Sequence, residues 1–465
     1  MSNSLNRCPF HSNGDDIDEL DMLDPKTRET PFTYYDWLRK HEGNRIYKLP
    51  QEKSFYVVHK HEDVKKILTN NVDFINHILP TKRSPFFALM DGENHLRIRN
   101  IVSHVLNPKK ELFPIQEINK HISKFTKNIA GKKAVELFQE WANPIPLSTL
   151  CIIFGLDHSL KTIDKLHSHA ITINRALFVL GGTGPRRKET PNFREKLIIL
   201  FSLIKNLGRI ITLYKVLGRK GFKEIREMFV LQKMPYDTPR PDFKQLPNAI
   251  YPILDLMLMF ARLLQKKQPK SEVLSFLKKS MESNKISFAE AITACAFIMF
   301  AGYETTSSLL SNCVNHLAFN PKEYQCLKEN PDEIGHFIDE ALRIYTPVGR
   351  FLRRAKKDVH ISNTLIPKGS MIILMLGAAN TDPDVFQNPY QFNSKRKNHK
   401  QSLSFGKGVH FCPGMILAKH QAKFALEQLI KETKSISAKE NFNPVMVSDR
   451  DNGILRYEKL YFDFT

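Results

Sequence analysis

The stretch from Phe405 to Gly414 constrains this chain most, because it places one cysteine between a glycine-rich loop and the start of a helix. It reads Phe405-Gly406-Lys407-Gly408-Val409-His410-Phe411-Cys412-Pro413-Gly414. Glycines let a backbone turn tightly and approach a flat ligand. The free N–H groups of a helix N-terminus stabilise a thiolate, and a preformed thiolate is an axial ligand that suits haem iron. We therefore interpret Cys412 as a metal ligand, with a buried structural cysteine as the alternative.

Composition indicates an ordinary globular chain. Its 465 residues are 42% hydrophobic and 25% charged, enough for a large core in one or two domains. Six scattered cysteines without a CxxC pair argue against a zinc site or a disulfide framework and fit a reducing compartment. Residues 1–24 are polar and acidic, unlike a signal peptide or a membrane anchor. We expect a soluble, cytoplasmic protein.

The charge balance is strongly basic, at +21. Such a balance suits nucleic acid, an anionic membrane or an acidic protein. The sequence shows no helix-turn-helix, zinc-finger or RNP-like motif, so we do not expect nucleic acid as a partner. An acidic electron-transfer protein is the more economical interpretation. Its expected docking face is the group of basic residues close in sequence to the cysteine loop: Lys395, Arg396, Lys397, Lys400, Lys407 and Lys419.

The pattern of elements predicts a mainly α fold with small β-sheets. Ser287 and Glu290 form a capping box that opens a long buried helix, which ends at Asn320-Pro321 after about 32 residues, or ~48 Å. A second helix begins at Asn330-Pro331 and ends at Thr346-Pro347. Further segments read as a strand at 54–59, a helix at 61–68, a helix at 93–106, a strand at 371–376 and hairpins from Pro444.

The middle of the long helix carries Ala301-Gly302-Tyr303-Glu304-Thr305-Thr306. An acid beside an alcohol inside an apolar helix is costly unless it is used or paired. The segment is therefore either a functional site or a helix kink whose polar groups are satisfied by hydrogen bonds.

The cysteine stretch resembles the haem-thiolate loop of the cytochrome P450 superfamily and matches the pattern FGxGxHxCxG at every fixed position. The resemblance covers roughly residues 25–465 and is strongest from Ser287 to Leu429. It implies the cytochrome P450 fold, a single haem-thiolate monooxygenase domain over 25–465 after the acidic segment 1–24, and haem b as cofactor with Cys412 as its iron ligand.

The resemblance also implies a role for each matching residue. Thr305 hydrogen-bonds the dioxygen and Glu304 connects the proton path to solvent. His95, Arg99, Arg353 and His410 match propionate partners, with Arg354 as the alternative to Arg353, while Phe405 and Gly406 lie against the proximal haem face. Glu340, Arg343 and Arg396 form a structural network. The expected pocket residues are Phe86, Phe87, Ala294, Phe297, Ala301, Val348 and Arg350; Arg350 either grips a substrate carboxylate or points outward or to a propionate.

Two departures from the family pattern stand out. Asn380-Thr381-Asp382 has threonine where relatives often have arginine. A basic insertion at about 185–244 carries 15 Lys/Arg and 6 Asp/Glu. Within it, Leu197–Leu217 is apolar but interrupted by lysine and arginine. This segment either lies peripherally on an anionic membrane, or contacts an acyl carrier protein, or packs on the enzyme's own core.

These features together predict a monooxygenase that hydroxylates or epoxidises a small apolar organic substrate. No fused reductase domain is visible, so the expected electron donor is a ferredoxin or flavodoxin with its NAD(P)H reductase. Two alternatives remain: a haem-thiolate enzyme of another reaction type (oxidative coupling, dehydration or peroxygenation), and a haem sensor.

Overall fold

A computed structural model of the chain describes residues 31–40, 46–48, 55–76, 81–84, 86–110, 113–180, 193–229, 246–438, 442, 444, 446–448, 454–457 and 459–465. The acidic segment predicted at 1–24 and parts of the basic insertion lie outside these ranges. The chain divides into two compact units. The first comprises Met1–Phe74, Asn119–Pro146 and Glu304–Thr465, and the second comprises Ile75–Ile118 and Leu147–Tyr303.

The first unit contains a five-stranded sheet in the order β1-β2-β8-β5-β3. β2 runs parallel to β8, whereas β1 pairs with β2 and β5 pairs with β8 in antiparallel fashion. The strands predicted at 54–59 and 371–376 are confirmed as β2 and β8. The five strands are β1 (Ile46–Lys48), β2 (Phe55–Val58), β3 (Phe74–Ile75), β5 (Arg350–Ala355) and β8 (Met371–Met375).

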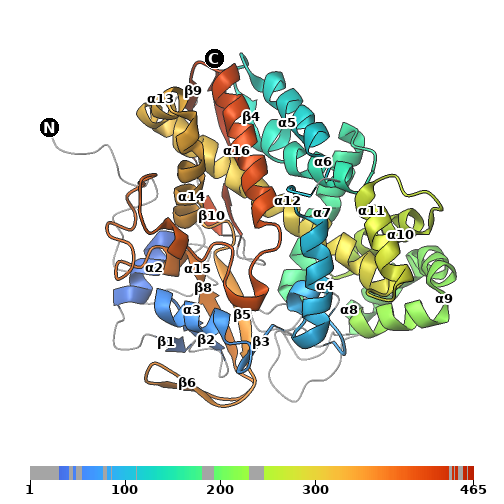
Figure 1. Cartoon of the computed structure of the whole chain (residues 1–465). Coiled ribbons are helices and arrows are strands. Elements are labelled where there is room, and N and C mark those ends of the chain that lie inside the picture. The colour runs from blue at the N-terminus through green and yellow to red at the C-terminus, as the bar shows by residue number, and fades with distance from the viewer. Residues whose placement is uncertain are drawn as a thin grey trace. The chain divides into compact units, whose positions relative to one another are not determined.

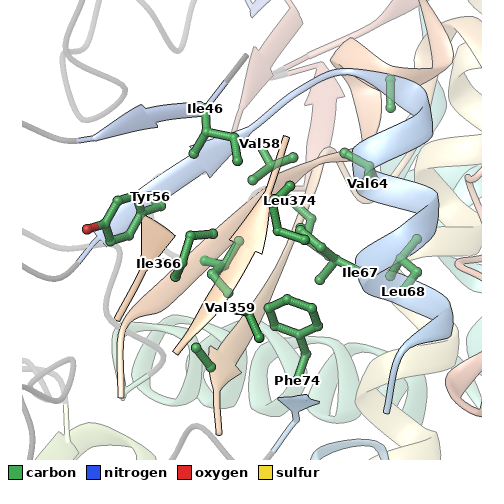
Figure 2. Packing of buried hydrophobic residues seen from close by; sticks show 14 of the residues in the cluster. Ile46, Tyr56, Val58, Val64, Ile67, Leu68, Phe74, Val359, Ile366 and Leu374 are labelled. Carbon is green, nitrogen blue, oxygen red and sulfur yellow. The ribbon is translucent and has the colours of Figure 1, made fainter. Parts of the chain in front are cut away.

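One helix covers a face of this sheet and forms an apolar core with it (Figure 2). The helix is α3 (His61–Thr69), and its buried Val64, Ile67 and Leu68 recur at i, i+3 and i+4 on one side. Leu374 of β8 belongs to the same cluster. This core holds α3 against the sheet. The C-terminal end of α3 lies beside Gly408 of the cysteine loop.

Helices and short hairpins complete the first unit (Figure 1). α14 packs against α16, and β10 pairs with β11 as the predicted C-terminal hairpin. β12 lies between β4 and β9. The bounds are α2 (Pro31–Lys40), α13 (Pro321–Glu329), α14 (Ile334–Tyr345), α15 (Leu376–Asn380), α16 (Met415–Glu432), β4 (Val135–Glu136), β6 (Val359–Ile361), β7 (Thr364–Ile366), β9 (Ile436–Ala438), β10 (Met446–Ser448), β11 (Leu455–Tyr457) and β12 (Tyr461–Phe464).

The second unit is helical in the part that the structure describes. α10 packs against α7, α8 and α9, and α11 packs against α4 and α10. Two helices, α5 (Ile115–Ile129) and α6 (Pro144–Ile153), continue from one unit into the other. The remaining bounds are α4 (Gly92–Val105), α7 (Leu160–Leu180), α8 (Phe193–Lys205), α9 (Leu207–Phe229), α10 (Leu246–Gln265) and α11 (Glu272–Glu282).

The long helix predicted from its capping box is α12 (Phe288–Phe319), with 32 residues. Glu290 donates its N–H to Ser287 Oγ at 3.1 Å, and Ser287 donates its N–H to Glu290 Oε2 at 2.9 Å. The reciprocal box is therefore confirmed. The helix begins in the second unit and ends in the first.

A test of helix length and hydropathy finds one described helix that could cross a membrane, Pro247–Gln265, of which 56% is buried within the structure. α8 from Lys196 and α9 pass the same test as a pair, bent by 62°.

Burial of His316 on α12 predicts acid-sensitive stability. The His316 ring stacks on Phe392, with the ring centroids 3.8 Å apart, and its Nδ1 shares a hydrogen bond with the Tyr345 hydroxyl. Burial at this site lowers the pKa of His316 to about 3. The unfolded chain takes up this proton near pH 6.5, so stability is present above that pH and falls as the pH drops toward 3. Between pH 7 and pH 5 we expect His316 alone to cost about 2 kcal/mol of unfolding free energy.

Denaturant unfolding of His316→Gln at both pH values measures this contribution. The variant should lose less stability on acidification than the parent, while His336→Gln, at an exposed site, should match the parent. Equal pH slopes for the parent and His316→Gln would show that the buried ring is not responsible.

Candidate active site

A closed loop carries Cys412 in the first unit. The Cys412 N–H donates to the Phe405 carbonyl at 2.9 Å, and the Gly406 N–H donates to the Leu403 carbonyl at 2.8 Å. A 3-10 turn over Gly408–His410 precedes the cysteine, and α16 begins three residues after it, at Met415. The cysteine therefore sits at the entrance to a helix, as the sequence predicted.

Two glycines allow the loop to pack tightly. Gly406 and Gly408 have φ values of 71° and 73°, which favour glycine. A Cβ on Gly408 would lie 2.7 Å from the Leu68 carbonyl oxygen at the end of α3, and a Cβ on Gly406 would lie 3.4 Å from the Phe351 ring of β5. The loop is therefore held between α3 and the sheet, with its backbone close to both.

The donor chemistry of the loop fits a haem iron. Cys412 is not in a disulfide and is partly exposed. Three other cysteines, Cys151, Cys295 and Cys313, are buried, and burial raises the pKa of each, that of Cys151 to about 12. Those three thiols are held in the neutral form, whereas Cys412 is accessible and lies at a helix entrance that favours a thiolate.

The three charged residues predicted as a structural network are brought together. Arg343 donates from Nε and Nη2 to the two carboxylate oxygens of Glu340 at 2.9 and 2.7 Å, and Arg396 Nε donates to Glu340 Oε1 at 3.0 Å. The Glu340 and Arg343 side chains are 1% and 0% exposed. One buried carboxylate thus serves two guanidinium groups, in bidentate geometry with the first.

Asn380 joins this network to the cysteine loop, a role that the sequence analysis missed. Its carbonyl oxygen accepts from Arg343 Nη1 at 2.8 Å, and its Oδ1 accepts from the Leu403 N–H at 2.7 Å. Its Nδ2 donates to Ser404 Oγ at 2.8 Å. The salt-bridged helix α14 is thereby connected to the residues directly before Phe405.

Thr381, which stands where relatives often have arginine, accepts a hydrogen bond from an arginine that is distant in sequence. Arg39 of α2 donates from Nη2 to Thr381 Oγ1 at 2.8 Å and to the Ala378 carbonyl at 2.8 Å. A guanidinium therefore reaches this turn from α2.

Alternation along β5 separates its arginines into two groups. Arg353 is 6% exposed and shares a face with Phe351, whose ring lies against Gly406. Arg354 donates from Nη1 to the Gly369 carbonyl at 3.0 Å. Arg350 acts on Tyr35 of α2: burial raises the pKa of Tyr35, and the Arg350 charge partly opposes that rise. Arg353 is thus the arginine on the cysteine-loop side.

The acid-alcohol segment lies inside α12. Glu304 is 7% exposed, and Thr305 is half-buried. In the second unit, the preceding Tyr303 shares a short hydrogen bond with His167 Nδ1 of α7, and a Cβ on Gly302 would meet Leu150 at 3.6 Å. Ala301 is half-buried and Ala294 is 4% exposed on the same helix.

His95 and Arg99, predicted to bind propionates, lie one turn apart on α4 of the second unit. His95 is 1% exposed and Arg99 is half-buried. Between them, Arg97 donates to Glu290 Oε1 at 2.8 Å. Burial raises the pKa of Glu290, but the Arg97 and Ser287 hydrogen bonds with the Arg97 and Arg83 charges outweigh it and hold that pKa below its ordinary value. This ion pair ties α4 to the start of α12.

Three predicted pocket residues form one aromatic cluster in the second unit. Phe86 and Phe87 precede or begin a 3-10 turn (Phe87–Leu89), and their rings lie 5.3 and 5.1 Å from the Phe297 ring of α12. Phe86 also contacts Phe300 at 5.3 Å and Phe229 of α9 at 6.4 Å. This cluster gives α12 and α9 a common apolar side. Val348, another predicted pocket residue, bridges to Ile454 in the first unit.

The basic residues around the cysteine loop differ in accessibility. Arg396, which the sequence suggested as part of a docking face, is 8% exposed and is committed to Glu340, so that expectation was wrong for this residue. Lys419 pairs with Asp339 at 2.6 Å. The remaining lysines of this group are exposed or half-buried: Lys395, Lys397, Lys400 and Lys407.

Comparison with known proteins identifies a family. The family model described as Cytochrome P450 matches residues 21–459. The chain is 38% identical over 196 residues to the "Biotin biosynthesis cytochrome P450" of Bacillus subtilis (strain 168), a match that covers 42% of this chain and 49% of that protein. It is 25% identical over 435 residues to the "Putative cytochrome P450 YjiB" of the same organism, covering 90% and 93%.

A solved structure shows the same fold. The crystal structure of "P450BioI in complex with hexadec-9Z-enoic acid ligated Acyl Carrier Protein" has a TM-score of 0.72 and 22% sequence identity, covering 95% of this chain and all of that chain. The predicted mainly α fold with small sheets is thereby confirmed.

Proposed function

The chain belongs to the cytochrome P450 family of haem-binding monooxygenases, and on this premise we propose that it hydroxylates or epoxidises a small apolar organic substrate. The observation that carries the proposal is the closed loop that presents Cys412 at the entrance to α16. When bound through Cys412, haem supplies dioxygen activation, which thiolate donation favours. The residues of this chain then bind and orient the substrate and deliver protons.

We assign the binding roles as follows. Cys412 would hold the iron, and Phe405 and Gly406 of the same loop would contact the haem. By the family resemblance, His410, Arg353, His95 and Arg99 would bind the propionates as cationic or N–H donors. The N–H groups that follow Cys412 tune the electron donation of its sulfur.

The proposed substrate is apolar because the predicted lining is apolar. Phe86, Phe87 and Phe297 form the aromatic cluster, and Ala294 and Ala301 add small side chains on α12. Apolar walls with few polar groups orient hydrocarbon substrates by shape. A carrier-bound acyl chain, of the kind named in the solved relative, is a second candidate substrate class.

Turnover of the haem-loaded protein with a ferredoxin or flavodoxin, its NAD(P)H reductase and dioxygen tests the proposal. Candidate substrates are first selected by the spin-state shift that they cause in the ferric haem. Isotopically labelled dioxygen should appear in the product. Product formed with peroxide but not with dioxygen and electrons would instead establish a peroxygenase, and loss of water without oxygen incorporation would establish a dehydratase.

Thr305→Ala should uncouple electron use from product formation while the protein stays loaded with haem. We propose that the Thr305 hydroxyl holds a proton at the reacting oxygen and that Glu304 relays protons from solvent. Without the hydroxyl, product per electron should fall by roughly a hundredfold, the modest end of what positioned proton donors contribute. Hydrogen peroxide released per electron should rise accordingly.

Thr305→Ser is the matched control, because it keeps the hydroxyl and should retain most of the coupling. Product and peroxide are measured per NAD(P)H oxidised. Equal coupling in the alanine variant and the parent would remove Thr305 from the proton path.

The exposed lysines near the cysteine loop are the proposed docking site for an acidic electron donor. Opposite charges steer encounter, and the effect weakens with salt. Lys397→Glu with Lys400→Glu should slow haem reduction by about tenfold at low ionic strength and flatten its salt dependence. Stopped-flow reduction by an acidic ferredoxin measures both.

Lys434→Glu is the control for charge alone. Lys434 follows the far end of α16, about 27 Å along the helix from Met415 at 1.5 Å per residue. It should change the reduction rate little. Parent reduction rates that are independent of ionic strength would argue against electrostatic docking altogether.

A further inference from the structure

Exposed apolar side chains are concentrated on α8 and the first half of α9. Nine of the fifteen large apolar side chains that are exposed among the described residues lie between Phe193 and Tyr214. Phe193 is 78% exposed, Phe201 66% and Ile204 56%. We call these nine side chains the α8–α9 patch. A concentration of exposed apolar side chains of this kind indicates an interaction site.

The helices that carry the patch are anchored on their inner side. Leu213 and Leu217 of α9 are buried, and α8 and α9 both pack on α10 (Figure 1). Ser202 donates its hydroxyl to the Pro247 carbonyl at 2.9 Å, and the Arg209 guanidinium lies 4.5 Å from the Tyr251 ring centroid. Packing on α10 thus accounts for the inner face of α9, whereas the nine patch side chains are exposed in the part of the chain that the structure describes.

The patch lies in a strongly basic segment. From Lys196 to Lys223 there are seven Lys and Arg residues and no Asp or Glu. Lys205 and Lys215, both exposed, are next to patch residues. Long basic side chains can keep their apolar stems along a buried surface while the charge reaches an anionic headgroup. The charge complementarity points to an anionic occupant.

Three uncharged polar side chains of this segment donate to backbone carbonyls of α8, α9 and α10. Ser202 binds Pro247, Asn206 Nδ2 donates to the Ser202 carbonyl at 2.9 Å, and Thr212 Oγ1 donates to the Gly208 carbonyl at 2.7 Å. Protein interfaces need directional hydrogen bonds, about one per 100–200 Å². A segment that offers aliphatic groups, phenyl groups and cations instead matches the interface of a bilayer, where no directional partner is required.

We propose that α8 and α9 bind the surface of an anionic lipid bilayer, with the patch in the headgroup–acyl boundary and the basic side chains on lipid phosphates. The helices lie on the surface, because the inner face of α9 stays packed on α10. This inference is independent of the monooxygenase chemistry. α9 ends at Phe229, next to Phe86, so the bilayer-bound helix leads to the aromatic cluster.

Flotation of the full chain with vesicles tests the proposal. One set of vesicles is phosphatidylcholine alone, and the other is phosphatidylcholine mixed with phosphatidylglycerol. The patch variant is Phe201→Ser with Ile204→Ser, and its control is Leu160→Ser, which removes another exposed apolar side chain (64%) outside the patch. The charge variant is Lys205→Glu with Lys215→Glu, and its control is Lys161→Glu, also at an exposed site.

The parent should float with the anionic vesicles and much less with the neutral ones. The patch variant should bind roughly tenfold to a hundredfold more weakly. The charge variant should lose the preference for anionic lipid, and both controls should bind like the parent. Because the substituted side chains are exposed, the variants should unfold at the parent temperature, which is checked by circular dichroism.

Several results would overturn the proposal. A parent that fails to float with anionic vesicles, or a patch variant that floats like the parent, shows that the patch does not bind lipid. Binding to an acidic, acyl-loaded carrier protein in the absence of lipid binding assigns the patch to a protein. Dimerisation of the parent that the patch substitutions abolish, with no vesicle binding, assigns it to a second copy of this chain.

Discussion

Cys412→Ser should abolish both the thiolate-type Soret band of the reduced carbon monoxide complex and substrate turnover. The proposed iron ligand is the sulfur of the closed loop, whose backbone is fixed by the hydrogen bond from the Cys412 N–H to the Phe405 carbonyl. A hydroxyl in the same place keeps that bond but donates far less electron density, and O–O cleavage depends on the donation. The optical spectrum of the reduced protein with carbon monoxide, and product analysis, measure the two effects.

Cys326→Ser is the control, because Cys326 is an exposed thiol on α13. This variant should retain the band and the turnover. A Cys412→Ser protein that keeps both would disprove the haem-thiolate assignment itself. One that keeps turnover but loses the band would show a reaction that does not use thiolate donation.

Glu340→Gln should cause the largest loss of stability. Glu340 compensates Arg343, which is fully buried, and Arg396, which is 8% exposed. Removing one partner of a buried ion pair leaves uncompensated charge and typically costs about 3–5 kcal/mol. The loss should extend to the cysteine loop, because Asn380 links Arg343 to Leu403 and Ser404. Denaturant unfolding and haem retention measure the two consequences.

Arg396→Lys keeps the charge but loses the fork geometry, and it should be milder, so it remains informative if Glu340→Gln does not fold. Glu333→Gln, at a partly exposed carboxylate directly before α14, should leave stability unchanged within about 0.5 kcal/mol. A Glu340→Gln protein as stable as the parent would mean that the two arginines are compensated by backbone carbonyls alone.

Several elements could be predicted because their causes are local. The capping box of Ser287 and Glu290 needs residues three apart, and it forms as expected at the start of α12. Glu340 and Arg343 are one helical turn apart, so their pairing follows from helix geometry. The positive φ values of Gly406 and Gly408 are consistent with residue type, because glycine adopts them without steric cost.

Other contacts could not be read from the chain, because their partners are distant in sequence. Arg39 reaches Thr381 across 342 positions, and Arg97 reaches Glu290 across 193. The sequence offers each arginine many possible acceptors, and tertiary packing selects the ones that it contacts. The expectation that Arg396 would join a docking face was wrong for the same reason. Its guanidinium donates to Glu340 and to the Gln387 carbonyl and is therefore buried.

The sequence alone determined the long helix and the family, and it predicted the loop that carries Cys412. These depend on backbone conformation and short-range hydrogen bonding, which residue types control directly. Tertiary structure alone decided which charges are buried, which arginine of β5 faces the cysteine loop, and which apolar side chains stay outside. Phe201 and Leu213 are both apolar residues of adjacent helices, yet one is 66% exposed and the other 1%. Their exposed fractions differ because different elements pack against the two helix faces. The periodicity of apolar residues in the sequence indicates which residues share a face, but not which element covers that face.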